Sequence, residues 1–256
     1  MRSASGFSVT AIAGMPLFAP GMSVAAEIAA ALDRSGDKLR DGDIVVVAQK
    51  IVSKAEGRTV ALADIEAGEG ARDLAAETDR PPALAQLILD ESAVVMRRHP
   101  AAVIARHRTG HVLANAGIDA SNVEGGEQGA VLLWPRDPDA SARAIRAGLG
   151  RRVAVVIADS MGRAWRIGTV GTAIGVAGLA VLDDRRGIDR DLYGRTLQAT
   201  VIAVADAVAA AAVLAMGEGA EGTPVALVRG LGRWVSDDDG PGAASGLRPI
   251  DQDMFP

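Results

Sequence analysis

Residues 41–48 read Asp41-Gly42-Asp43-Ile44-Val45-Val46-Val47-Ala48. A turn-forming Asp-Gly-Asp run precedes a compact run of Ile, Val and Ala, and this composition predicts a strand buried in the core. A second apolar run of the same kind occupies residues 153–158 and ends at Asp159. The two runs predict two buried strands, and the second of them carries a carboxylate at its end.

Segments of helical character alternate with the apolar strand candidates along the rest of the chain. Pro81 and Pro82 stand at or before the start of one helical segment, where a missing amide proton costs little. We expect further strands at residues 200–204 and 225–228, and helices at residues 24–32, 83–95, 141–149 and 206–216. This alternation predicts a mixed α/β fold.

Two stretches of the chain are unusual in composition. Glycines recur from Gly168 to Gly178 with apolar residues between them, which close backbone packing and a loop around a ligand would both explain. Residues 236–256 are polar and lack periodicity, so we expect a tail that is partly disordered or draped over the surface. No linker divides the remainder, and we predict that residues 1–235 form one domain that can comprise two subdomains.

Composition excludes several classes of protein. Apolar residues make up 49% of the 256 residues and aromatic residues only 3%, so the core must be aliphatic. The formal charge of −5 argues against a nucleic-acid partner, which usually requires a basic face. The chain has no cysteine, which rules out disulfides and thiolate metal sites and is compatible with the reducing cytoplasm where we expect it.

The most apolar stretch, residues 199–216, approaches the length of a membrane span. It contains Asp206, and its second half is rich in Ala, a strong helix former. We therefore interpret it as a strand followed by an Ala-rich helix, and we expect no membrane association.

Two acidic stretches, residues 115–122 and 157–166, contain the candidate chemistry. Each places a carboxylate, Asp119 or Asp159, beside small residues and side-chain oxygens just after an apolar run. Such oxygen groups favour a hard divalent cation, which commonly holds phosphates. Asp159 alone is equally consistent with capping of a helix, and the similar context of Asp119 favours a metal site.

Other residues near these stretches allow both a functional and a structural interpretation. Ser160 can add a hydroxyl ligand, and Glu218 lies between two glycines in a third acidic turn, although glycine after a helix is usually a C-cap. Lys54 can neutralise a phosphate, although most lysines are merely solvated. Asn122 is typical of turns as well as of phosphate contacts.

Three further residues, Arg163, Trp165 and Arg166, present a cationic and aromatic surface beside Asp159. Guanidinium groups suit bidentate recognition of carboxylates or phosphates, and an indole can stack on a flat heterocycle. The histidines are too few and too scattered for a zinc site or a Ser-His-Asp triad. We expect each histidine to be a surface or packing residue.

Taken together, six segments resemble the coenzyme F420-0:L-glutamate ligase family. The resemblance covers residues 14–232, in the family's order, and lies in residues 42–58, 115–122, 159–166, 171–179, 191–195 and 217–222. It implies a family-specific mixed α/β fold that is not a Rossmann domain. It also implies GTP-dependent addition of L-glutamate, with further γ-linked glutamates able to follow, to the terminal carboxylate of the deazaflavin coenzyme F420-0.

The resemblance also implies roles for individual residues. Asp119 and Asp159 match ligands of one divalent cation, Mn²⁺ or Mg²⁺, and Ser160 and Glu218 match ligands of a second. Together with Lys54, the two aspartates would be the catalytic residues. The positions that match nucleotide contacts are Gly14, Met15, Pro16, Leu17, Gln49, Lys54, Asn122, Met216, Gly217, Gly219, Ala220, Glu221, Gly222 and Thr223. Related enzymes form homodimers and respond to K⁺.

The implied reaction passes through an acyl phosphate, formed when a carboxylate attacks the γ-phosphoryl group of GTP. Both reactants of this step are anions, so divalent ions, Lys54 and Arg163 or Arg166 would screen their repulsion. Two alternatives stay open. The first is a nucleotide-dependent ligase that joins an amine to another acid, and the second is a non-catalytic GTP-binding regulatory protein.

Overall fold

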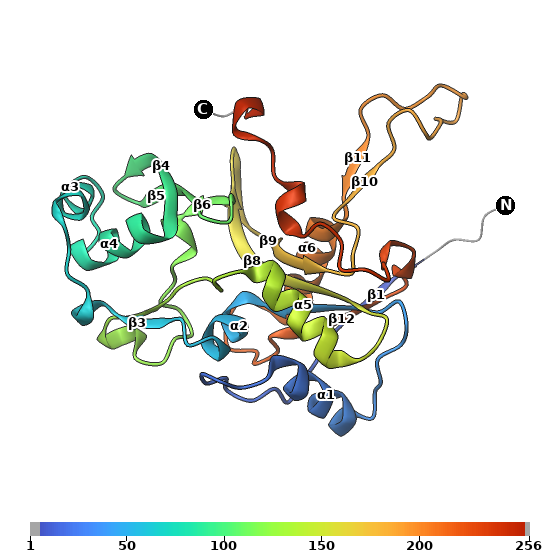
Figure 1. Cartoon of the computed structure of the whole chain (residues 1–256), viewed down its shortest axis with the longest axis horizontal. Helices are drawn as coiled ribbons and strands as arrows, with labels where there is room; N and C mark the ends of the chain where they lie inside the picture. Colours follow the sequence, from blue (N-terminus) through green and yellow to red (C-terminus); the bar gives the residue numbers. More distant parts are fainter. Residues whose placement is uncertain (1–5, 254–256) are drawn as a thin grey trace.

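The chain folds around a five-stranded mixed sheet in a computed structural model that describes residues 6–253. The strand order is β1-β12-β2-β8-β9, in which β2 and β8 pair in parallel and every other pair of neighbours is antiparallel (Figure 1). The strands are β1 (Ser8–Ala11), β2 (Ile44–Ala48), β8 (Ala154–Arg163), β9 (Arg166–Ala177) and β12 (Val225–Arg229). The two predicted buried strands are therefore confirmed, and they lie side by side.

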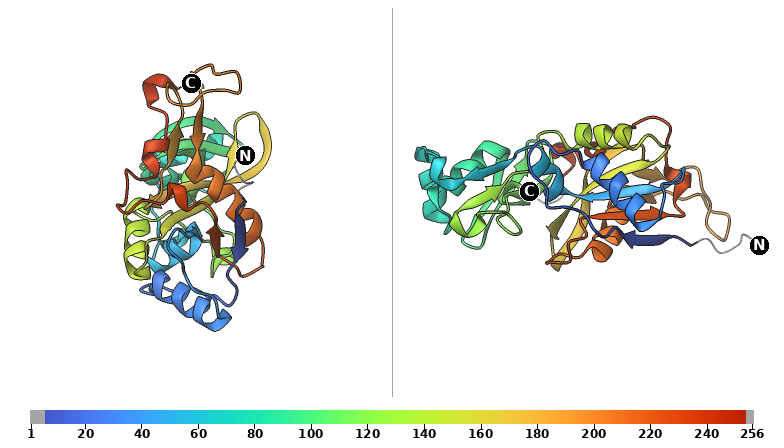
Figure 2. Two further views of the ribbon diagram at one scale, coloured as in Figure 1. Left: turned by 90° about the vertical axis from the view of Figure 1, so that its right-hand side faces the viewer. Right: turned by 90° about the horizontal axis from the view of Figure 1, so that it is seen from below.

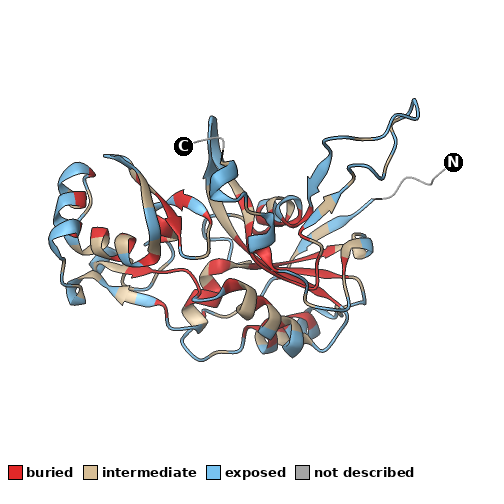
Figure 3. Ribbon diagram, turned by 45° about the horizontal axis from the view of Figure 1, so that its top comes forward, coloured by how far each residue is buried: buried red, intermediate tan, exposed pale blue. Residues whose placement is uncertain are grey.

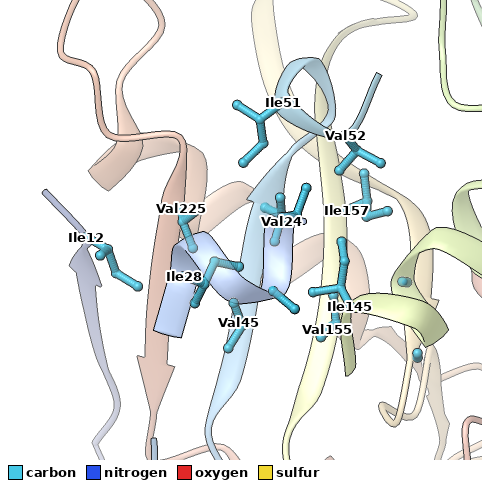
Figure 4. Close-up of a cluster of buried hydrophobic side chains, with 14 of the residues drawn as sticks. Ile12, Val24, Ile28, Val45, Ile51, Val52, Ile145, Val155, Ile157 and Val225 are labelled. Atoms are coloured by element: carbon cyan, nitrogen blue, oxygen red, sulfur yellow. The ribbon is translucent and has the colours of Figure 1, made fainter. Parts of the chain in front are cut away.

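Helices cover both faces of this sheet. On one face, α1 (Val24–Ser35) and α5 (Pro138–Leu149) pack on Val45 and Val47 (Figure 4). On the other face, α6 (Val204–Met216) packs on Ile44 and Val46. Because successive strand residues point to opposite faces, the continuous apolar run of β2 contributes side chains to both cores. Figure 3 shows that the strands at the centre of the molecule are buried.

A smaller lobe lies beside the main sheet and has an apolar cluster of its own (Figure 2). Its main sheet has the order β4-β5-β6, and a separate two-stranded ladder joins β3 and β7. Leu74, Ile88 and Val103 are fully buried in its cluster. The elements are β3 (Thr59–Ala61), α3 (Glu69–Glu77), α4 (Pro82–Glu91), β4 (Ser92–His99), β5 (Ala102–His107), β6 (Val112–Ala114) and β7 (Ala130–Leu132).

The remaining elements connect or extend these two bodies. Helix α2 (Gln49–Ala55) follows β2 directly, and β10 (Leu182–Asp184) pairs with β11 (Val201–Ala203) at the base of a projecting arm (Figure 1). Short 3₁₀ helices occupy Leu62–Asp64, Asn115–Gly117, Gly126–Gln128, Gly232–Trp234, Ala243–Gly246 and Ile250–Gln252. The mixed α/β fold without Rossmann topology is confirmed, whereas a single domain over residues 1–235 stays a prediction.

The two largest differences from the predicted boundaries occur at the ends of α4 and β8. The helix expected over residues 83–95 ends at Glu91, and Val94 and Val95 belong to β4, where β-branched side chains are favoured. The strand expected to end at Asp159 continues to Arg163, because β9 pairs with it as a long antiparallel hairpin. Asp159 therefore lies within a strand and caps no helix.

The glycine-rich stretch from Gly168 to Gly178 lies largely in β9, and close packing explains two of its glycines. A Cβ on Gly171 would lie 2.6 Å from the carbonyl oxygen of Ala209 in α6, and one on Gly175 would lie 2.4 Å from that of Pro138 in α5. Both distances are too short for any side chain, so these glycines allow the helices to approach the sheet. Of the two explanations left open by the sequence, backbone packing is the correct one at these positions.

The C-terminal segment is draped over the molecule as far as it is described. Arg146 of α5 donates hydrogen bonds to Ser236 O at 2.7 Å and to Asp239 Oδ1 at 2.7 Å, and Ala243 is buried. Residues 254–256 lie outside the described residues. Between residues 6 and 253, no helix has both the length and the apolarity needed to cross a bilayer.

A buried polar cluster connects the smaller lobe to the main sheet. Glu91 accepts hydrogen bonds from Arg58 at 2.9 Å and from Arg108 at 2.8 Å, and His107 Nε2 lies 3.4 Å from the same carboxylate oxygen. These hydrogen bonds and cations hold the pKa of Glu91 down at about 2 against the opposing effect of its burial. His111 is also buried, and burial, assisted by the neighbouring His107, lowers its pKa to about 4.

His111 should make stability depend on pH. Below about pH 6.5 the unfolded chain protonates this residue, whereas the folded protein resists protonation down to about pH 4. The contribution of neutral His111 to the free energy of unfolding is therefore fully present above pH 6.5. It is lost as the pH falls toward 4, by up to about 3 kcal/mol. Urea unfolding of wild type and His111→Asn across this range measures the loss. A difference between the two proteins that does not change with pH would contradict it.

Candidate active site

A cavity of about 350 Å³ opens at one edge of the main sheet. The parallel pairing of β2 and β8 brings their carboxyl ends to this edge, and β12 runs antiparallel, so its amino end is there too. The lining therefore combines segments far apart in the sequence, namely residues 15–18, 48–51 with Lys54, 158–160, and 216–224 with Val213, together with Asn122. Ligands commonly bind outside the carboxyl ends of such strands.

Helix α2 directs two lysines toward the loop that contains Asp119. Lys50 and Lys54 are four residues apart, so they lie on one face of the helix. Lys50 Nζ donates to Asp119 Oδ2 at 2.6 Å, and Lys54 Nζ donates to the carbonyl oxygen of Asn122 at 2.6 Å. Burial, reinforced by the charge of Lys50, lowers the pKa of Lys54. Lys54 thus lies in the last turn of a short helix and lines the cavity, and its role toward a phosphate stays a prediction.

Asp159 lies on the wall of the cavity with one side open to it. Its Oδ2 accepts a hydrogen bond from Trp134 Nε1 at 2.8 Å, and its Oδ1 accepts one from the main-chain N–H of Ser160 at 2.9 Å. Removal from water nevertheless raises the pKa of Asp159, and with a smaller contribution from the charge of Asp119 the pKa reaches about 6. A cation in the cavity would favour the ionised carboxylate.

The turn after α6 forms another part of the lining. Ser160 Oγ donates a hydrogen bond to Glu218 Oε1, Asn122 Nδ2 donates to Gly219 O at 3.1 Å, and Thr223 Oγ1 closes the turn on Met216 O at 2.7 Å. Gly217 has a φ of 78°, and a Cβ there would meet the Glu221 carboxyl carbon at 2.3 Å. The structure thus brings the predicted residues Asn122, Ser160 and Glu218 together.

Most of the residues predicted to bind the nucleotide line this one cavity. Gln49 does so although its amide already donates to Ser53 Oγ at 2.6 Å. Gly14 does not line it, but its carbonyl oxygen is held by Arg34 at 2.7 Å next to the lining segment. The predicted positions found in the lining are Met15, Pro16, Leu17, Gln49, Lys54, Asn122, Met216, Gly217, Gly219, Ala220, Glu221, Gly222 and Thr223.

Four other predicted residues do not line the cavity. Asp119 lies outside its lining, paired to Lys50 and Ser121, and these partners lower its pKa against the effect of burial. Arg163, Trp165 and Arg166 lie at the tip of the β8–β9 hairpin, where Trp165 is 88% exposed. Their role in substrate binding stays a prediction.

The side chains at the cavity suit a hard divalent cation. Asp159, Ser160 and Glu218 supply only oxygen atoms, whereas Asp119 would first have to exchange the Lys50 ammonium for the cation. Within residues 6–253 no three acidic or histidine side chains are grouped closely enough to hold a metal ion by themselves. This fits Mg²⁺ or Mn²⁺ held by one or two carboxylates, with the remaining ligands from water and phosphate.

Sequence reasoning missed Lys50 and Trp134 as site residues. Lys50 had a usable signal, because Lys38, Lys50 and Lys54 are the only lysines of the chain and two of them share one short helix. Trp134 had no such signal, because a Trp after an apolar run is most simply a core residue. Its bond to Asp159 depends on the pairing of distant segments.

Comparison with known proteins identifies the family. A family model described as F420-0:Gamma-glutamyl ligase matches residues 14–230. The chain is 44% identical over 254 residues to the coenzyme F420:L-glutamate ligase of Methanothermobacter thermautotrophicus, an alignment that covers 98% of this chain and 99% of the relative. It is 43% identical to the enzyme of that name from Methanopyrus kandleri, over 85% of this chain and 87% of the relative. The chain therefore belongs to the F420-0:gamma-glutamyl ligase family.

Proposed function

We propose that this chain is a GTP-dependent ligase that joins L-glutamate to coenzyme F420-0 through a γ-linked amide. Relatives named coenzyme F420:L-glutamate ligase align with it over 86–99% of their length. The observation that carries the proposal is the cavity, whose lining contains nearly all the residues proposed to bind the nucleotide, together with Asp159, Ser160 and Glu218. We propose that the reaction takes place in the cytoplasm. Disulfides rarely persist in this reducing compartment, and a chain without cysteine needs none.

The proposed reaction proceeds in two steps. A carboxylate oxygen of F420-0 attacks the γ-phosphorus of GTP, the bond to the β-phosphate oxygen breaks, and GDP leaves. The amine of glutamate then attacks the acyl carbon, phosphate leaves, and the nitrogen loses a proton as the amide forms. Repetition on the new terminal carboxylate would lengthen the glutamate chain.

The residues of the cavity would contribute charge and position. Lys54, with Lys50 beside it, would reduce the repulsion between the attacking carboxylate and the phosphates. Asp119, Asp159, Ser160 and Glu218 would hold two divalent ions, Mn²⁺ or Mg²⁺, which when bound would neutralise phosphate charge. Phosphoryl transfer needs mainly such positioning and neutralisation, which suits a cavity without Cys or His in its lining.

Phosphate release from GTP tests the proposal directly. Release should require Mn²⁺ or Mg²⁺, L-glutamate and F420-0 together, and mass spectrometry should find one glutamyl unit or more added to the deazaflavin. The same assay with K⁺ replaced by Na⁺ tests the proposed response to K⁺. Release with another acid in place of F420-0 would indicate a different ligase, and tight GTP binding without turnover would indicate a regulatory protein.

Replacing Asp119 tests the metal assignment. Asp119→Asn should lower turnover at least roughly 100-fold at low Mn²⁺, because it removes a carboxylate ligand of the divalent cation that would neutralise the phosphates. Circular dichroism and the melting temperature should stay close to wild type. Glu127→Gln is the matched control, since Glu127 is an exposed acid of the same loop that does not line the cavity. A near-normal rate for Asp119→Asn at low Mn²⁺ would remove Asp119 from the metal site.

Replacing Lys54 should weaken the binding of the nucleotide more than it lowers the stability of the fold. Lys54→Met should raise the KM for GTP roughly 10–100-fold, because a charge-assisted contact to phosphate contributes about 1.5–3 kcal/mol. Lys38→Met is the control, because Lys38 does not line the cavity. Steady-state kinetics at varied GTP measures the effect, and an unchanged KM would place the phosphates elsewhere.

We also propose that the enzyme acts as a homodimer. The arm between β10 and β11 exposes Leu192 at 102% and Tyr193 at 86%, and the β8–β9 hairpin exposes Ile167 at 102%. In Figure 1 both features project away from the body of the molecule. Large apolar side chains gathered on projecting elements are typical of interfaces.

Light scattering coupled to size exclusion tests the dimer. Wild type should have about twice the 26.2 kDa mass of the chain, because two copies would cover the exposed apolar side chains. Leu192→Asp combined with Tyr193→Asp should shift the mass toward the monomer. The control Ile250→Asp alters an exposed apolar residue of the C-terminal segment and should leave the mass unchanged. A wild type that is monomeric throughout would refute the dimer.

A further inference from the structure

One short segment, β7 and the residues after it, contacts the main chain of Asp119 and the carboxylate of Asp159, the two candidate metal ligands. Leu132 exchanges two main-chain hydrogen bonds with Asp119, one from Asp119 N at 3.2 Å and one to Asp119 O at 2.8 Å. Two residues later, Trp134 Nε1 donates to Asp159 Oδ2 at 2.8 Å. Asp119 and Asp159 belong to different parts of the fold, and this segment contacts both residues.

The indole of Trp134 is held rigidly. Its side chain is fully buried, and the ring centroids of His107 and His111 lie 4.9 Å and 5.5 Å from its own. Its main-chain oxygen accepts a hydrogen bond from Arg58 Nε at 2.8 Å, and Arg58 is fixed in turn by Glu91. The indole therefore cannot move away from Asp159 without disturbing the buried cluster between the two lobes.

The loop that contains Asp119 is shaped around the same indole. A Cβ on Gly117 would lie 2.5 Å from Trp134 Nε1, so only glycine allows the main chain to pass this edge of the ring. Asn115, Ala116 and Gly117 all have positive φ angles, of 50°, 51° and 77°. Such a run costs free energy at its two non-glycine residues and persists only where its surroundings require it.

We infer that Trp134 is a positioning residue, which sets the orientation of the Asp159 carboxylate and its separation from Asp119 for a divalent cation. This inference rests on the proposed function, because it takes the two carboxylates as metal ligands. The indole N–H occupies one lone pair of Asp159 Oδ2 and the Ser160 N–H occupies one of Oδ1, which leaves one lone pair on each oxygen for a cation. Groups that orient metal ligands in this way typically change metal affinity 10–100-fold.

Manganese binding to the metal-free protein tests the inference without turnover. Trp134→Phe keeps an aromatic ring in the pocket but removes the N–H donor, and it should weaken Mn²⁺ binding roughly 10–100-fold in a titration followed by electron paramagnetic resonance. Trp234→Phe is the matched control, because Trp234 Nε1 likewise donates to an aspartate, Asp183 Oδ2 at 3.1 Å, and neither residue lines the cavity. Its Mn²⁺ affinity should equal that of wild type.

A second measurement uses the unaltered protein, so that it does not depend on the folding of a variant. In a ¹H–¹⁵N spectrum, Mn²⁺ should broaden the indole N–H resonance of Trp134 before that of Trp234, with assignments from Trp165→Phe and Trp234→Phe. A Trp134 resonance that stays sharp at saturating Mn²⁺ would overturn the inference.

The outcomes separate the inference from the proposed function. If wild type does not bind Mn²⁺, the proposed metal site fails and the inference fails with it. If wild type binds Mn²⁺ and a folded Trp134→Phe protein binds it equally well, only the inference is overturned. Loss of Mn²⁺ affinity together with an unchanged KM for GTP supports positioning of the metal ligands.

Discussion

The parallel pairing of β2 with β8 is the constraint on which the rest of the structure depends. It brings the carboxyl ends of two buried strands to one edge of the sheet, where α2 begins at Gln49 and β8 reaches Asp159. The antiparallel β12 then places the turn after α6 at the same edge, since Pro224 O bonds to Ala48 N at 2.8 Å. The cavity depends on the directions of the strands, because its lining residues are far apart in the sequence and the sheet brings them together.

The charges at this edge of the sheet bear on why Asp159 occurs together with Lys50 and Lys54. The buried side of Asp159 makes its negative charge unfavourable, while Lys50 and Lys54 crowd two positive charges on one turn of helix. Each arrangement is costly alone, and phosphate together with divalent cations would relieve both. Apart from Lys38 and three histidines, every other basic residue of the chain is an arginine, so two of the three compact, strongly hydrated ammonium groups lie at this cavity, where we propose that phosphates bind.

The sequence predicts what local patterns determine. The apolar runs of β2 and β8 and the Ala-rich α6 were recognisable, because composition and length fix them. The change from α4 to β4 at Ser92 was not, because both elements are apolar and only the pairing with β5 separates them. Likewise the extension of β8 beyond Asp159 depends on β9, and the place of Lys50 beside Asp119 depends on the approach of two segments 69 residues apart.

Trp134 shows why only some residues of a site can be predicted from a sequence. Asp119, Asp159 and Glu218 carry charges that can bind a polar ligand, so their residue types alone indicate a candidate functional site. The indole contributes its shape and a single N–H donor. Their role can be recognised only in the folded chain, where Gly117 and Asp159 lie at the same edge of the ring. Because this ring also packs on His107 and His111, the geometry of the two carboxylates is coupled to the contact between the lobes. Trp134 is therefore the point at which the buried cluster between the lobes contacts the Asp159 carboxylate.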